Sequence, residues 1–212
     1  MRAAAFGLYL AGLTGAFGLR TWLHTRRTGS SGFHGISGRP GSPSWWAGVL
    51  FVLALVLGVT APALVLTGVV PIPAGAVADG RAAAGLVLLI FGITAVLAAQ
   101  SGMGTSWRVG VDEGERTELV TGGVFGVVRN PIFTAMVLTQ TGLSLAVPTP
   151  LAGAALGCLV VAVELQVRVV EEPYLRRVHG GAYDAYAART GRFLPAIGRL
   201  HPGAHPAPGV AR

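Results

Sequence analysis

A cation and two carboxylates flank a stretch of sequence that is otherwise apolar. Arg129 stands directly before one apolar run, and Glu171 and Glu172 stand directly after the next. The two runs, residues 132–147 and 151–170, are separated by a Pro-Thr-Pro turn and should fold as antiparallel helices. The arginine and the carboxylates then meet at one membrane face, where charges usually bind a partner or a ligand.

The acidic pair belongs to a longer series of charges. Glu164, Arg168, Glu171 and Glu172 follow the spacing i, i+4, i+7, i+8, which predicts one shared face of the fifth apolar helix. Two carboxylates at a helix C-terminus oppose the helix dipole and need a cation or hydrogen-bond donors, which a ligand could supply. The alternative is a structural Glu164–Arg168 ion pair followed by a solvated acidic end.

Two further segments should lie on the same side of the membrane. Asn130 and Pro131 predict a helix start, where free backbone N–H groups favour a ligand carboxylate and Arg129 could pair with it. Alternatively, Asn130 is only a cap. Gly102 and Gly104 end the third apolar segment, where glycine permits close approach of a ligand or simply terminates the helix.

Aromatic residues near the C-terminus have helical spacing. Tyr183 and Tyr186 lie at i, i+3, which is typical of packing, although their rings could equally line an adenine pocket. The histidines do not pair at metal-ligand spacing, and the single cysteine, Cys158, lies inside an apolar run. The sequence therefore predicts no metal site.

Transmembrane helices are the elements expected to position these groups. Of the 212 residues, 52% are hydrophobic and 12% are charged, against about 25% charged in a soluble domain. The first apolar segment is interpreted as a retained helix rather than a signal peptide, and the fourth is short for a span of about 20 residues. The five predicted spans are residues 3–23, 45–70, 82–102, 132–147 and 151–170.

The placement of arginine predicts the orientation. Arginine accounts for all 16 basic residues, and only Arg2 and Arg81 fall on the side opposite to residues 24–44, 105–130 and the C-terminal tail. The positive-inside rule then puts the N-terminus outside and the C-terminus in the cytoplasm, as an odd number of spans requires. The net charge is +7, but the sequence has no cluster of basic residues interleaved with aromatic residues. The lack of such a cluster argues against nucleic-acid binding.

The sequence therefore predicts an all-α, multi-pass protein of the cell membrane. A helical hairpin and a short helical tail would form a site that faces the cytoplasm. Residues 1–81 would contain the first two spans, residues 82–200 the functional core, and residues 201–212 a disordered tail.

Together these residues resemble the superfamily of isoprenylcysteine carboxyl methyltransferases and phospholipid methyltransferases, which are integral membrane enzymes. The resemblance covers about residues 100–197. The family pattern begins with Leu-Val and a Gly turn, followed by Arg-His-Pro-x-Tyr and a helical hairpin. After the hairpin come Glu-Glu-x-x-Leu, Gly-x-x-Tyr-x-x-Tyr and an aromatic-Leu-Pro ending. The matching segments, in the same order, are residues 119–125, 129–133, 171–175, 180–186 and 193–195.

The resemblance implies S-adenosylmethionine as cofactor, S-adenosylhomocysteine as product, and a lipophilic substrate that enters from the bilayer. Arg168 matches the position of a substrate-orienting arginine, and Glu171 and Asn130 would act beside it at the reacting groups. Arg129 and Glu172 would support the cofactor pocket. The residues implied to line it are Gly102, Gly104, Leu119, Val120, Phe125, Asn130, Pro131, Phe133, Glu171 and Tyr183.

Two positions depart from the family pattern. Asn130 replaces a histidine and can donate a hydrogen bond but cannot act as an acid or base near neutral pH. Phe133 replaces a tyrosine and keeps only the ring. The predicted function is methyl transfer by in-line displacement to a carboxylate, thiol or amine of a lipophilic small molecule or lipid. The alternative is a membrane binding or scaffold protein that retains the fold without catalysis; a transporter is disfavoured because no inverted repeat is visible.

Overall fold

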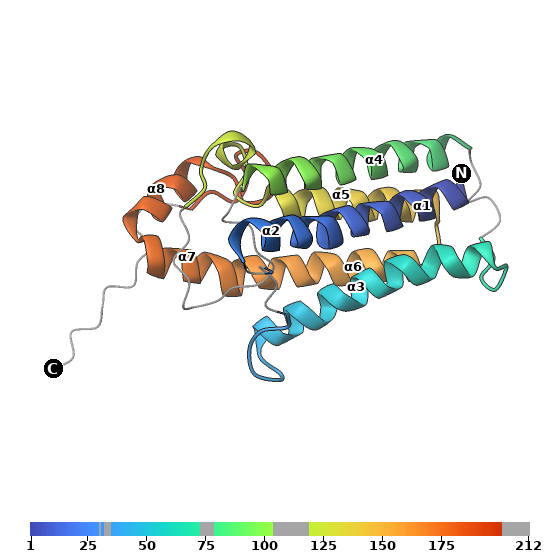
Figure 1. Ribbon diagram of the computed structural model, residues 1–212, viewed down its shortest axis with the longest axis horizontal. Coiled ribbons are helices and arrows are strands. Elements are labelled where there is room, and N and C mark those ends of the chain that lie inside the picture. The colour runs from blue at the N-terminus through green and yellow to red at the C-terminus, as the bar shows by residue number, and fades with distance from the viewer. Residues whose placement is uncertain (30, 32–34, 73–78, 104–118, 201–212) are drawn as a thin grey trace.

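The structure is a computed structural model that describes residues 1–29, 31, 35–72, 79–103 and 119–200. These residues form helices joined by turns, and no strand occurs among them. The long helices lie side by side in a bundle, and two short helices, α7 and α8, extend beyond one end of it (Figure 1). The prediction of an all-α protein is confirmed.

Four helical stretches are long and apolar enough to cross a membrane. A fifth apolar helix, α5 (Pro131–Ala146), has 16 residues, fewer than the roughly 20 that a straight span needs. Each of the five predicted segments is therefore helical over most of its length, although the second ends at Leu66 rather than at residue 70. The four long stretches are Arg2–Thr28, made of α1 (Arg2–Leu13), a π-helical turn (Thr14–Leu19) and α2 (Arg20–Thr28); α3 (Pro43–Leu66); α4 (Asp79–Gly102); and Pro150–His179, made of α6 (Pro150–Leu165), a π-helical turn (Gln166–Glu171) and α7 (Glu172–His179).

Proline and hydroxyl side chains mark where several helices begin. Helices α3, α5 and α6 each start with proline, which has no N–H to leave unsatisfied there. The Ser42 hydroxyl caps α3 by accepting from the Trp45 N–H at 3.3 Å, and the Thr149 hydroxyl caps α6 by accepting from the Ala152 N–H at 3.2 Å. The turn between α5 and α6 is therefore short and well defined, as the predicted hairpin requires.

Small residues allow α4 to pack closely along α5, as α3 packs along α6. A methyl group added at Gly142 of α5 would lie 2.7 Å from the Gly85 carbonyl oxygen and 2.8 Å from the Leu89 Cα of α4. Such contact between backbones is typical of membrane helices, which pack through small residues.

Gly142→Ala should therefore destabilise the bundle by about 1–3 kcal/mol, because backbone atoms cannot move aside as a side chain can. Gly157→Ala on α6 is the control, since a methyl group there meets nothing within 4 Å. Thermal unfolding of the purified variants in detergent measures both. An equal stability for Gly142→Ala and wild type would contradict the close packing of α4 on α5.

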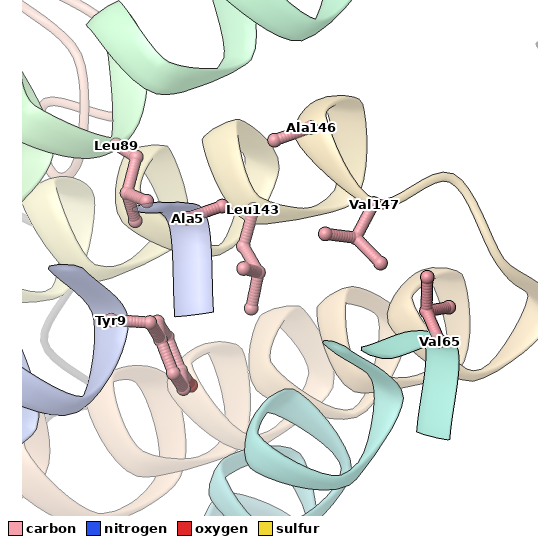
Figure 2. Close-up of a cluster of buried hydrophobic side chains, with 7 residues drawn as sticks. All are labelled: Ala5, Tyr9, Val65, Leu89, Leu143, Ala146 and Val147. Carbon is pink, nitrogen blue, oxygen red and sulfur yellow. The ribbon is translucent and has the colours of Figure 1, made fainter. Parts of the chain in front are cut away.

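A hydrophobic core fills one end of the bundle. Figure 2 shows Tyr9 of α1, Leu89 of α4, Leu143 of α5 and Val65 of α3 converging there. This end also holds the N-terminus, whereas α7 and α8 lie at the opposite end (Figure 1). The packed core therefore leaves the α7 and α8 end for a cavity.

The last long helix departs from the prediction that it ends before Glu171. It continues through the π-helical turn into α7 and ends at His179. A π-helical turn takes more residues than an α-helical turn, so side-chain positions shift around the axis. The prediction that Glu171 and Glu172 form a helix C-terminus is wrong, and the dipole argument does not apply to them.

Candidate functional site

A cavity of about 600 Å³ opens at the α7 and α8 end of the bundle. Its wall comes from the first part of α3, the starts of α5 and α7, the 3-10 turn Gly123–Gly126 and α8 (Gly181–Arg189). Residues predicted from distant parts of the sequence meet at this wall. They are Leu119, Val120, Phe125, Arg129, Asn130, Pro131, Phe133, Glu171, Glu172 and Tyr183.

Two predicted residues, Gly102 and Arg168, are not among the residues that line this wall. Gly102 is the last residue of α4, and a methyl group there would make an ordinary contact with Phe125. Gly104 lies outside the described residues. Arg168 is more than half exposed and forms an ion pair with Glu164, so the alternative of a structural pair describes it.

The charged series on α6 and α7 does not share one face. Glu171 and Glu172 line the cavity, whereas Glu164 and Arg168 do not. The prediction of a common face assumed an unbroken α-helical period, and the π-helical turn Gln166–Glu171 interrupts it. The sequence therefore predicted the place of Glu171 and Glu172 at the cavity, but its prediction that Arg168 lies beside them is wrong.

Two arginines neutralise Glu172, which is only 6% exposed. Arg129 donates from Nη2 to Oε1 at 2.7 Å. Arg192 donates from Nε to Oε1 and from Nη2 to Oε2, both at 2.8 Å. These hydrogen bonds to Glu172 raise the pKa of Arg192. The cations that Glu172 needs therefore come from the chain itself, not from a ligand.

Arg129 also holds the residues after α8 against the start of α5. Its guanidinium donates to the carbonyls of Ala187 and Gly198, each at 3.0 Å, and to the carbonyl of Thr190. Its side chain is almost fully buried. Arg129 and Glu172 thus form a buried clamp that supports the cavity wall.

Asn130 stands at the start of α5, but its side chain makes no capping hydrogen bond. The amide Nδ2 donates instead to the Arg192 carbonyl oxygen at 3.1 Å, and the backbone N–H of Asn130 donates to the same oxygen. Val128 forms a parallel β-bridge with Gly191 beside these bonds. The interpretation of Asn130 as a side-chain cap is wrong: it attaches the C-terminal segment.

Glu171 differs from Glu172 in its surroundings. It lies at the end of the π-helical turn and lines the cavity. Its Oε1 accepts a hydrogen bond from Gln166 Nε2 at 3.1 Å, and Gln166 lines the cavity as well. This arrangement orients a carboxylate at the cavity wall, where it can attract a positively charged ligand group.

Tyr183 and Tyr186 pack against each other, as their helical spacing predicted, and also line the cavity. They are buried and stack edge to face, with centroids 6.2 Å apart, and both line the cavity. The Tyr186 hydroxyl donates to the Phe125 carbonyl oxygen at 2.6 Å, which fixes the 3-10 turn. Burial raises the pKa of Tyr186 to about 12 and also raises that of Tyr183. Both hydroxyls are therefore neutral near pH 7.

Gln100 is a cavity residue that the sequence analysis missed. It is 2% exposed near the end of α4 and donates from Nε2 to the Ala16 carbonyl at 3.1 Å. Its Oε1 is buried and has no hydrogen-bond partner among the described residues. An orphaned acceptor at a cavity wall fits a ligand with N–H or O–H donors, which S-adenosylmethionine has in its ammonium, amino and hydroxyl groups. An amide inside an apolar run was the available signal.

The remaining wall of the cavity is apolar and lies among the membrane helices. Phe17, Phe51, Leu55 and Met136 belong to it and come from the π-helical turn after α1, from α3 and from α5. Gly35, also on this wall, belongs to the segment before α3, for which the sequence offered no signal. One cavity thus combines a polar end with an apolar extension.

Metal binding has no support in the part of the chain that the structure describes. No group of three or more His, Cys, Asp or Glu side chains there could hold a metal ion.

Among the comparisons with known proteins, one finds a matching family. No curated protein and no solved structure matches the chain. The family model described as phospholipid methyltransferase matches residues 81–182, which include α5, α6, α7 and both cavity carboxylates. That family lies within the superfamily of membrane methyltransferases that the sequence motifs of this chain resemble.

Proposed function

We propose that this membrane methyltransferase transfers a methyl group from S-adenosylmethionine to a lipophilic acceptor in the 600 Å³ cavity. The observation that supports this proposal is the continuity of the cavity. A polar wall with Glu171 and Gln100 adjoins an apolar wall among membrane helices, so a charged cofactor and a lipophilic molecule have adjacent places. Proteins of the matching family generally use S-adenosylmethionine.

The polar wall has groups of the kinds that this cofactor needs. Glu171 can attract its cationic groups, and Gln100 Oε1 can accept one of its hydrogen bonds. The rings of Phe125 and Tyr183 offer apolar surface for an adenine. The bound cofactor would supply an electrophilic methyl group on a sulfonium.

The chain's contribution to the reaction is chiefly alignment and exclusion of water. In-line displacement requires the acceptor atom, the methyl group and the leaving sulfur to be aligned. Binding the cofactor and the acceptor in one cavity favours this alignment. Phe133 and the neighbouring rings keep water from the polar wall. Asn130 cannot remove a proton, so the proposal fits an acceptor that is already nucleophilic: a carboxylate, a thiolate or a neutral amine.

Arg168 is not assigned to acceptor binding, because it is ion-paired with Glu164 outside the cavity wall. All described arginines except Arg2 and Arg81 lie toward one end of the bundle, and the polar wall lies at the same end (Figure 1). We place this end in the cytoplasm on the positive-inside rule, where a soluble cofactor has access.

The function can be tested with purified protein, methyl-labelled S-adenosylmethionine and a lipid extract of the native membrane. Mass spectrometry should find the label in lipid-soluble products, whose masses identify the acceptor. Failure to bind the cofactor in calorimetric titration would overturn the proposal. Cofactor binding without any labelled product would favour the non-catalytic alternative, with which the structural bond from Asn130 to Arg192 also agrees.

A further inference from the structure

A second, smaller cavity of about 40 Å³ lies deeper among the helices. It shares part of its wall with the main cavity, so the two are neighbours along the bundle. The shared residues are Leu13, Phe17, Phe51, Leu55 and Met136. A long apolar molecule in the main cavity therefore has a further space ahead of it.

The wall of the small cavity includes a buried polar pair. The Tyr9 hydroxyl of α1 donates to Gln140 Oε1 of α5 at 3.0 Å. Figure 2 shows the Tyr9 ring directed from α1 into the space between the helices. Gly58 of α3 makes room for the pair, since a methyl group there would lie 2.8 Å from Tyr9 Cζ and 3.0 Å from Gln140 Oε1. Three helices therefore meet at an amide and a phenol.

One hydrogen-bonding group of this pair is unused. Gln140 is 2% exposed, and its Nε2 has no hydrogen-bond partner among the described residues. A buried amide donor without a partner is costly, and polar side chains within membrane spans usually face a functional cavity. The small cavity has the volume for one hydroxyl-sized group.

We propose that the small cavity receives a hydroxyl group on the hydrocarbon tail of the lipophilic acceptor, and that Gln140 selects for it. A hydroxyl can accept from the amide and can donate to a neighbouring oxygen. This inference rests on the proposed function for the acceptor's reacting end, but the selection itself is a property of binding.

The geometry sets the position of that hydroxyl. Pro131 at the polar wall and Gln140 belong to one helix, and nine residues of α-helix rise about 14 Å. An extended chain covers this length with roughly a dozen bonds, because three backbone bonds span about 3.5 Å. A hydroxyl near the twelfth carbon from the reacting end should therefore reach Gln140.

The test is a binding competition without cofactor. The protein in nanodiscs is offered equal amounts of stearate and 12-hydroxystearate, and native mass spectrometry measures which is retained. We expect a preference of about fivefold or more for the hydroxy acid, the size of one hydrogen bond. 3-Hydroxystearate, whose hydroxyl stays near the polar end, should compete no better than stearate.

Variants assign the preference to Gln140. Gln140→Met keeps the length of the side chain and should reduce the preference to about one. Thr141→Val is the control, because the Thr141 hydroxyl already donates to the Val137 carbonyl and lines neither cavity. Glu171→Gln should keep the preference even if it fails to methylate, which separates this inference from the proposed function.

Three outcomes would overturn the inference. They are equal retention of stearate and 12-hydroxystearate, no retention of either acid, and an unchanged preference in Gln140→Met. Equal retention would mean that a trapped water, rather than the tail of a substrate, satisfies the amide. The comparison of 3-hydroxystearate with 12-hydroxystearate uses the wild-type protein, so it decides the matter even if Gln140→Met does not fold.

Discussion

The Glu171→Gln variant should bind S-adenosylmethionine roughly 10- to 100-fold more weakly than wild type, because a charge-assisted hydrogen bond contributes about 1.5–3 kcal/mol. Glutamine keeps the shape of the side chain and removes only its charge. Gln166 holds one oxygen of Glu171 at 3.1 Å, so the carboxylate is oriented before a ligand arrives. Calorimetric titration measures the affinity, and methyl transfer to the identified acceptor should fall at least as far.

Glu164→Gln is the matched control for this variant. It removes the same charge from the same continuous helix, but Glu164 is paired with Arg168 and does not line the cavity. Its affinity should stay within about twofold of wild type. An equal loss in both variants would mean that the total charge matters rather than the site. No loss in Glu171→Gln would remove Glu171 from the cofactor site.

The Arg129→Met variant should lose about 3–5 kcal/mol of unfolding free energy, because it leaves Glu172 buried with only Arg192 as a cation. The carbonyls of Ala187 and Gly198 lose a donor at the same time. The residues after α8 should then detach more readily from α5. Thermal unfolding in detergent measures the stability, and faster proteolysis near residues 190–200 reports the detachment.

Two further variants test this account of Arg129. Arg176→Met breaks a partly exposed pair with Asp184 at 3.2 Å and should cost less than about 1 kcal/mol. Adding Glu172→Met to Arg129→Met removes the isolated charge and should restore part of the stability. A double variant no more stable than Arg129→Met would show that the hydrogen bonds to the carbonyls, and not the charge of Glu172, dominate.

Much of the architecture follows from short-range signals. Apolar runs predicted the five spans, and Pro131 predicted the start of α5, because these signals act within a few residues. The cavity carboxylates were predicted from their place after an apolar run. Their partner Arg192 was not, since an ion pair across 20 residues depends on how the chain folds back.

One π-helical turn explains why the charged residues before α7 were misplaced. The shared face of Glu164, Arg168 and Glu171 was predicted from a constant helical period, and a π-helical turn changes that period without a clear sequence signal. Gln100 and Gln140 carried a usable signal, because an amide in an apolar run is costly to bury. What each amide faces became clear only from the neighbouring helices.

The clamp around Arg129 has a consequence for biosynthesis. The carbonyl of Gly198 is one of its acceptors, and Arg192 is the second cation on Glu172. A ribosome makes the chain from its N-terminus, so all the long helices are synthesised before these two residues and leave the ribosome ahead of them. The bundle can therefore enter the membrane with the site still incomplete, and the last described residues then close it.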